Sequence, residues 1–115
     1  MEKFTSLDLS TVYLKPETHD WLRSQDPESV ECPIYFVQTD SGWIVWVYSV
    51  AADDEALEQI PADLADCVRL AFEEDCRLIL FDSDGCDCEQ LHKYVDEWEE
   101  RLHKKYGASP YREIL

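Results

Sequence analysis

Four short apolar stretches in the chain predict β-strands. Residues 7–14 alternate apolar and polar side chains, which indicates a strand with one face toward solvent. Residues 33–39 and 43–48 are rich in β-branched and aromatic side chains, and the polar link at 40–42, which contains a glycine, predicts a β-hairpin. Residues 78–81 are apolar without interruption, so we expect an interior strand that is covered on both faces.

Apolar residues at helical spacing predict three helices, over residues 16–25, 60–73 and 87–106. The polar face of the second helix is expected to present to water Asp63, Asp66, Arg69 and Glu73. The third helix carries an apolar stripe made of Leu91, Tyr94, Val95, Trp98, Leu102 and Tyr106. Such a stripe packs in a core or forms a dimer seam, so a monomer and a homodimer both stay open.

The order of these elements, β-α-β-β-α-β-α, predicts a single α+β domain over residues 1–106. Its first six elements match the ferredoxin-like plan, which has a mostly antiparallel sheet. In that plan two crossover helices cover one face of the sheet, and we expect the third helix to cover the other. Residues 107–115 start with a glycine that can end the last helix, and we expect them to form a loosely ordered tail.

The chain is strongly acidic: its 115 residues include 26 Asp and Glu against 10 Lys and Arg, which gives a net charge of −16. Residues 51–100 alone hold 17 acidic and three basic side chains. This charge repels nucleic acids and anionic membranes and attracts basic protein surfaces, so we expect a protein partner. A surface that only keeps the protein in solution is the alternative. The candidate partner-binding residues are Asp53, Asp54, Glu55, Glu73, Glu74, Asp75, Asp96, Glu97, Glu99 and Glu100.

The sequence also predicts a cellular compartment. No apolar run approaches the length that spans a bilayer, and the first residues lack the apolar core of a signal peptide. The five cysteines are odd in number and irregularly spaced, which is typical of reduced thiols. We therefore expect a cytoplasmic protein.

A second candidate site follows the apolar run at 78–81. Ligands of open α/β sheets bind at the carboxyl ends of strands, and five side chains with metal-binding atoms come there in sequence: Asp82, Asp84, Cys86, Cys88 and His92. Two thiolates and an imidazole can bind zinc, but Cys-x-Cys is one residue shorter than the usual pair. The alternative is a turn capped by the aspartates, with the thiols packed as small apolar side chains. We assign no cofactor and no catalytic residue, and zinc stays the alternative.

Four segments carry a further signal: STVYLKPETHDWL (10–22), GWIVWV (42–47), IPADLADCVRLAFEEDCRLILFDSDG (60–85) and LHKYVDEW (91–98). Together they resemble a small uncharacterised domain family that is encoded on bacterial plasmids, prophages and genomic islands. The resemblance implies a bacterial, mobile-element setting and transfers no catalytic residue.

These observations favour a non-enzymatic binding protein over an enzyme. The leading hypothesis is a small acidic cytoplasmic module that binds a basic surface of another protein. A sharper version is a DNA mimic, whose carboxylates imitate the phosphates of DNA and inhibit a host defence or other nucleic-acid-binding protein. The alternative is a small-ligand or metal-binding domain that uses the loop at 82–88 and could be enzymatic.

Overall fold

The computed structural model describes residues 5–26, 28–29, 32–49 and 54–106, with the backbone alone described for Asp54 and for residues 102–106. The expected tail at 107–115 lies outside the described residues. The strands are β1 (Ser6–Ser10), β2 (Tyr35–Gln38), β3 (Gly42–Trp46) and β4 (Leu78–Asp82). The α-helices are α1 (Pro16–Ser24), α2 (Asp54–Leu57), α3 (Ala62–Glu73) and α4 (Val95–Tyr106), and 3-10 turns follow β1 and β3.

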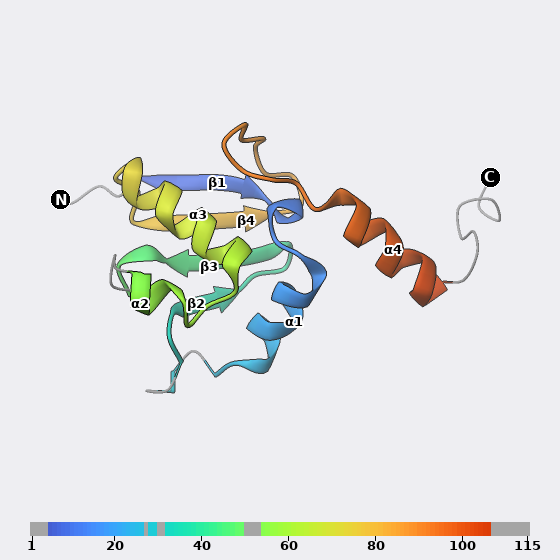
Figure 1. The fold of residues 1–115 in the computed structure, drawn as a ribbon, viewed down its shortest axis with the longest axis horizontal. Helices are drawn as coiled ribbons and strands as arrows, with labels where there is room; N and C mark the ends of the chain where they lie inside the picture. The colour runs from blue at the N-terminus through green and yellow to red at the C-terminus, as the bar shows by residue number, and fades with distance from the viewer. Residues whose placement is uncertain (1–4, 27, 30–31, 50–53, 107–115) are drawn as a thin grey trace.

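The four strands form one sheet in the order β1-β4-β3-β2 (Figure 1). β1 is parallel to β4, and the other two pairs are antiparallel, so the predicted α+β class and mostly antiparallel sheet are confirmed. The ferredoxin-like strand order is wrong, because that order places the first strand inside the sheet and here it lies at the edge. Burial explains the difference: β4, which is apolar from Leu78 to Phe81, takes the interior position, and the half-polar β1 takes the edge.

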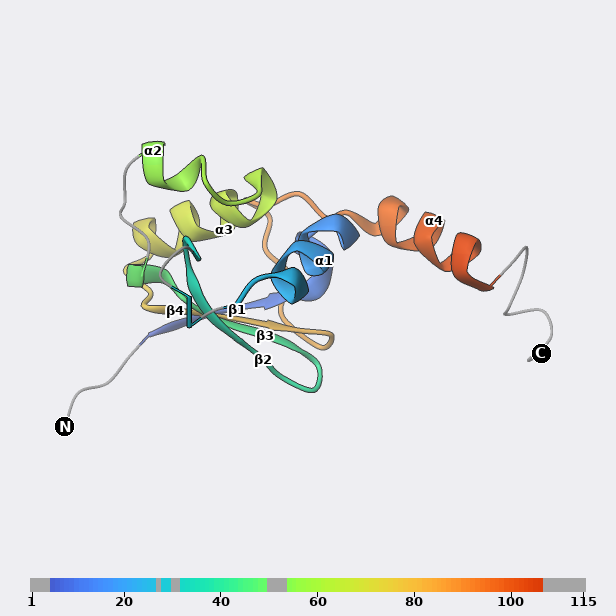
Figure 2. The ribbon, with the colours of Figure 1, turned by 90° about the horizontal axis from the view of Figure 1, so that it is seen from below.

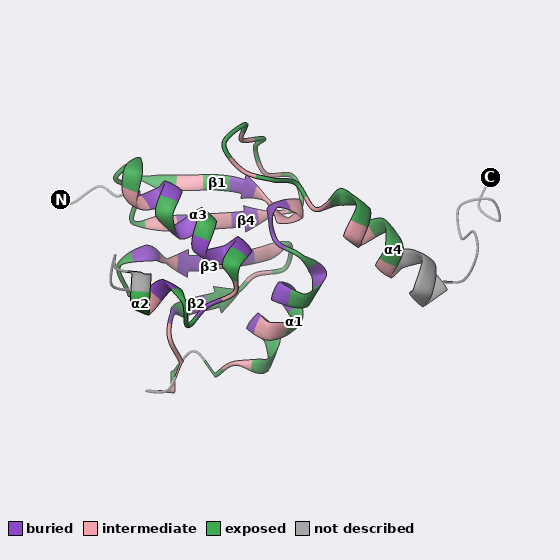
Figure 3. Cartoon of the chain, viewed as in Figure 1, coloured by how far each residue is buried: buried purple, intermediate pink, exposed green. Residues whose placement is uncertain are grey.

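One face of the sheet carries the core. Helices α1, α2 and α3 lie on that side, as Figure 2 shows, and Figure 3 shows buried residues on the elements that face each other. Every second strand residue points into this layer. The helices contribute three fully buried side chains to it, Leu22, Leu64 and Val68. The strand residues buried there are Leu9, Phe36, Trp43, Val45, Ile79 and Phe81.

No helix of the described residues covers the opposite face of the sheet (Figure 2). The alternate residues of β2, β3 and β4 lie on it, and they stand apart from the buried core cluster. The prediction of helices on both faces, and of an interior strand covered on both sides, is therefore wrong for the described part of the chain. We call this surface the open face; its apolar residues are Tyr35, Val37, Ile44, Trp46, Leu78 and Leu80.

Helix α4 begins at Val95, eight residues later than the pattern predicted, and it extends beyond the end of the sheet (Figure 1). The segment before it uses its backbone for other bonds: Cys86 accepts a hydrogen bond from Ser10 N, and Tyr94 N donates to the carbonyl of Val12 at 2.8 Å. These bonds hold the segment against the end of β1 and prevent helical pairing. α4 then packs against α1, where Trp98 Nε1 donates to the carbonyl of Leu14 at 2.9 Å.

A buried carboxylate joins α3 to α1. Asp63, predicted to face water, is only 5% exposed and accepts hydrogen bonds at 2.7 Å from Lys15 N and from the Thr18 hydroxyl. Lys15 is the residue that caps α1, and its own side chain makes no capping bond. Asp63 thus satisfies a donor at the start of one helix from the first turn of another.

Within the described residues, no helix has both the length and the apolar character that crossing a bilayer requires.

Candidate functional site

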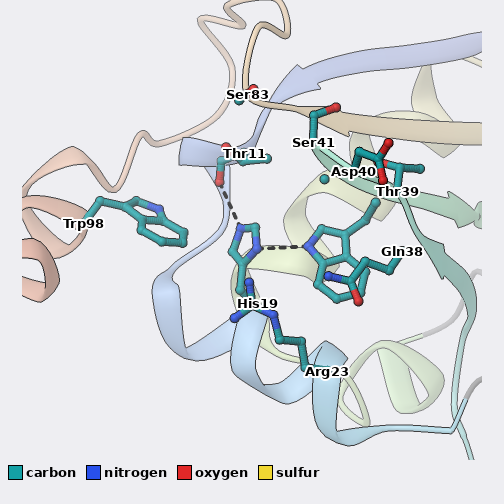
Figure 4. Close-up of a pocket in the computed structure, with 11 residues that line it drawn as sticks. Thr11, His19, Arg23, Gln38, Thr39, Asp40, Ser41, Ser83 and Trp98 are labelled. Carbon is teal, nitrogen blue, oxygen red and sulfur yellow. Dashed lines mark hydrogen bonds between the residues drawn. The ribbon is translucent and has the colours of Figure 1, made fainter. Parts of the chain in front are cut away.

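A polar pocket of about 360 Å³ lies where α1, the β2–β3 hairpin and α4 meet (Figure 4). α1 supplies His19 and Arg23 to its wall, and α4 supplies Trp98. The hairpin and the loop after β4 add hydroxyl, amide and carboxylate groups, so the lining offers hydrogen bonds beside two indole rings. The remaining lining residues are Thr11, Gln38, Thr39, Asp40, Ser41, Gly42, Trp43 and Ser83.

His19 is fixed by contacts on both ring nitrogens. Nδ1 accepts a hydrogen bond from Trp43 Nε1 at 2.9 Å, and Nε2 lies 3.4 Å from the carbonyl of Thr11, to which it donates. The ring also meets Trp98 edge-on, with centroids 4.8 Å apart. Burial lowers the pKa of His19, which favours the neutral imidazole. With both nitrogens bonded inside the protein, His19 holds α1, β3 and α4 together, and we assign it no acid–base role.

The pocket brings together no nucleophile and base among the described residues. Arg23 is paired with Asp20 at 3.4 Å, and the Ser41 hydroxyl donates to Asp82 at 2.8 Å. Asp20 is in turn held by Arg101 of α4 at 2.8 Å, and the hydrogen bond from Arg101 lowers the pKa of Asp20. The pocket therefore joins α4 to the domain, and its chemistry is that of polar contacts.

The loop after β4 was predicted as a ligand or metal site. Asp82 Oδ1 accepts from Asp84 N at 2.9 Å and Oδ2 from Ser41, and these two bonds lower the pKa of the Asp82 carboxyl, the backbone bond first. Cys88 N donates a hydrogen bond to the hydroxyl oxygen of Tyr13, so its backbone is already bonded within the protein. Within the described residues no three His, Cys, Asp or Glu side chains are grouped so that they could hold a metal ion. The local geometry is that of an aspartate-capped turn.

The predicted partner-binding carboxylates fall into two groups at opposite ends of the long axis (Figure 1). Glu55 lies on α2, and Glu73, Glu74 and Asp75 end α3 or follow it; all four are exposed. The group on α4 comprises the exposed Asp96, Glu99 and Glu100 and the half-buried Glu97. Asp53, and the side chain of Asp54, lie outside the described residues. The structure therefore does not bring these acids onto a single face.

The open face is a feature that the sequence interpretation missed. The strand register arranges its residues in rows, with Leu78, Trp46 and Tyr35 in one and Leu80, Ile44 and Val37 in the next. Tyr35 and Val37 are 43% and 40% exposed, which is high for apolar side chains in a sheet. The signal was present in the sequence as β-strands apolar at every position, but periodicity does not say whether a chain covers both faces itself.

An apolar pocket of about 490 Å³ lies at one end of the open face. Its lining includes Leu78 and the rings of Tyr35 and Trp46, whose centroids are 4.9 Å apart. Tyr48, which is 53% exposed, also lines the pocket, and the Arg77 guanidinium lies 5.9 Å from the Tyr48 ring. The hydroxyl of Tyr48 donates to Asp75 at 3.2 Å. The pocket can accept a large apolar side chain.

Comparison with known proteins gives a family and no function. Neither the curated proteins nor the solved structures contain a significant match to this chain. Residues 6–98, from β1 into α4, match the C-terminal domain of a family of unknown function, DUF5983. The match covers most of the chain and agrees with the expected uncharacterised domain, and the chain therefore belongs to the DUF5983 family.

Proposed function

We propose that the protein is a non-catalytic binding module that attaches to a basic surface of another protein. The observation that carries the proposal is the open face: three adjacent strands form a continuous apolar and aromatic surface, exposed at Tyr35 and Val37 and half-buried at its other positions, in a chain whose net charge is −16. Contiguous apolar surface of this kind, surrounded by polar residues, is typical of protein interaction sites. The acidic field adds selectivity, because it attracts basic partners and repels nucleic acids.

The cellular setting is part of the proposal. We infer a cytoplasmic protein of bacterial mobile elements, on the basis of the five free cysteines and of the sequence resemblance. An inhibitor of a host defence or regulatory protein fits such a setting. Imitation of DNA is the finer version, and it requires carboxylates in rows. The two separate acidic groups, with Arg69 among the carboxylates of α3 and Arg77 just after Asp75, give that version less support than plain protein binding.

The alternative function, a small-ligand domain built on the loop at 82–88, has weaker support. The oxygens of Asp82 accept hydrogen bonds from Asp84 N and the Ser41 hydroxyl, and Cys86 and His92 are exposed. Native mass spectrometry tests this alternative directly, because a bound metal or ligand adds its mass to that of the folded protein and is lost on chelation or denaturation.

A measured affinity tests the binding function. The tagged protein captures candidates from a bacterial lysate, and the purified partner is then titrated against the wild type and two variants of equal charge. Val37→Lys places a cation on the open face, and Gln59→Lys places one on the exposed helix side. We expect Val37→Lys to weaken binding at least about tenfold, because it puts a charge into an apolar contact, and Gln59→Lys to change it little. Equal affinities for the two variants would refute binding through the open face.

A further inference from the structure

The open face has the dimensions of a helix-docking surface. Its two apolar rows are separated by two residues along the strands, roughly 7 Å, and span three strands, roughly 10 Å across. An α-helix is about 10 Å wide, and its residues i and i+4 are about 6 Å apart along the axis. A helix of about three turns, aligned with the strands, therefore places one side chain on each row.

The charges around the open face select the kind of helix. Asp8 lies beside Leu80 in the parallel register, and Asp82 continues the same strand beyond Leu80. Asp8 is exposed and Asp82 is half-buried, and Asp75 stands at the apolar pocket, bonded to Tyr48. Among the residues that line the apolar pocket, the basic one is Arg77, and its guanidinium lies 5.9 Å from the centre of the Tyr48 ring. A helix with lysine or arginine on the flanks of its apolar stripe complements the carboxylates at this border.

We propose that the open face binds an amphipathic helix of a partner protein, with aromatic or aliphatic residues along one stripe and basic residues beside it. The inference rests on the proposed protein-binding function and names the partner's element. The apolar pattern of β3 and β4 predicts a layer that covers the open face, and the partner's helix supplies that layer. The largest side chain of the helix enters the apolar pocket lined by Tyr35 and Tyr48.

The charges disfavour a second copy of this chain as the occupant. The chain's own amphipathic candidate is α4, whose first half holds Asp96, Glu97, Glu99 and Glu100, while its three basic residues, Arg101, Lys104 and Lys105, are in the second half. Docking α4 of one copy beside Asp8 and Asp82 of another opposes carboxylates, in addition to the repulsion between two chains of −16 each. A foreign basic helix meets no such repulsion.

Two designed peptides test the proposal. Both are helical, about 14 residues long, with Trp and Leu at i, i+4 and i+7; one has lysines beside the stripe and the other has glutamates. Fluorescence anisotropy of the labelled peptides measures their affinity for the full-length protein at low salt. We expect the lysine peptide to bind at least about tenfold more tightly than the glutamate peptide. Equal binding of the two peptides, or no binding of either, would overturn the charge-selected helix.

Variants then locate the bound peptide. Val37→Lys, and independently Tyr48→Ala, should weaken the lysine peptide about tenfold, while Gln59→Lys should not. Asp8→Asn should weaken it about threefold, and the exposed Glu58→Gln less than that. Peptide affinity unchanged by Val37→Lys and Tyr48→Ala would place the helix elsewhere. A concentration-dependent dimer that Val37→Lys dissociates would replace the foreign helix by a second copy.

The two proposals fail in different ways. If a purified partner protein binds the wild type and loses affinity with Val37→Lys while neither peptide binds, the helix inference is wrong and the protein-binding function stands. If the partner binds Val37→Lys as tightly as the wild type, the partner does not bind through the open face, whether or not the peptides bind. Circular dichroism of each variant confirms that the fold is intact before its affinity is compared.

Discussion

Replacing Asp63 with alanine is expected to destabilise the fold by about 3 kcal/mol. The carboxylate accepts from two donors, Lys15 N and the Thr18 hydroxyl, each at 2.7 Å, and Thr18 is 3% exposed. A hydrogen bond to a charged group contributes about 1.5–3 kcal/mol, and its loss leaves a buried donor unpaired. About 1.5 kcal/mol for each of the two donors gives the expected loss of about 3 kcal/mol. Loss of the negative charge near the start of α3 adds a few tenths of a kcal/mol.

A double-mutant cycle separates the two donors. Thr18→Val removes the hydroxyl donor and is expected to cost about 1.5 kcal/mol in the wild-type background. In the Asp63→Ala background the same substitution should cost less, because the hydrogen bond is already lost there. The control is Asp66→Ala, one turn along the same helix, where the side chain is 61% exposed and pairs with Arg69 at 3.4 Å. It should cost less than about 0.5 kcal/mol.

Urea unfolding, followed by tryptophan fluorescence and by circular dichroism, measures these free energies. The slope with denaturant should stay the same in all variants, so that shifts in the midpoint report stability. Two results would contradict this prediction: Asp63→Ala costs no more stability than Asp66→Ala, or the costs of the substitutions at 63 and 18 add up in the double variant. Either result would mean that Asp63 does not join α1 to α3.

Three further predictions follow from particular contacts. Burial lowers the pKa of His19 below that of an unfolded histidine, which is about 6.5. Between pH 6.5 and 5 the unfolded state therefore binds more protons than the folded state, so the free energy of unfolding should fall as the pH drops through this range. Urea titrations should show a weaker dependence on pH for His19→Gln. Gly85→Ala should cost about 1–3 kcal/mol, because its Cβ would lie 2.2 Å from the carbonyl oxygen of Leu9, whereas Ser83→Ala on the exposed loop should have little effect; equal midpoints would contradict the close approach. Added salt should raise Tm as the Debye length shrinks from about 30 Å to about 8 Å, and a Tm indifferent to salt would mean that the net charge of −16 is already compensated.

Local signals predicted the elements that local chemistry determines. The hairpin of β2 and β3 is confirmed, because a short polar link with a glycine between two apolar runs specifies it. α1 starts at Pro16 as expected, and α3 follows the helical spacing of its apolar residues. These features need no information from distant parts of the chain.

Contacts between distant residues determined what the sequence did not show. The late start of α4 depends on the bond between Tyr94 and Val12, more than 80 residues apart in the chain, and the burial of Asp63 depends on Thr18, 45 residues away. The interior place of β4 beside β1 depends on the path of two crossovers. Periodicity carries none of this, since it describes one element at a time.

The candidate site shows the same limit. The acidic residues were predicted correctly as exposed where the structure describes them, except for the half-buried Glu97, but their division between α2–α3 and α4 follows from the tertiary arrangement. His19 was not singled out, because a buried histidine on an otherwise polar helix gives no pattern. Its bond from Trp43, 24 residues away, becomes visible only in the folded chain.

Methyl NMR shows directly whether a partner binds on the open face. Labelled methyl groups of Ile44, Leu78 and Leu80 report on that face, and those of Leu64 and Val68 report on the covered side. On titration with the purified partner or the lysine peptide, we expect the methyl resonances of Ile44, Leu78 and Leu80 to shift and to saturate together, while the α3 methyl resonances stay nearly unchanged. Saturable binding that leaves these three methyls unmoved, or that shifts Leu64 and Val68 instead, would contradict this expectation.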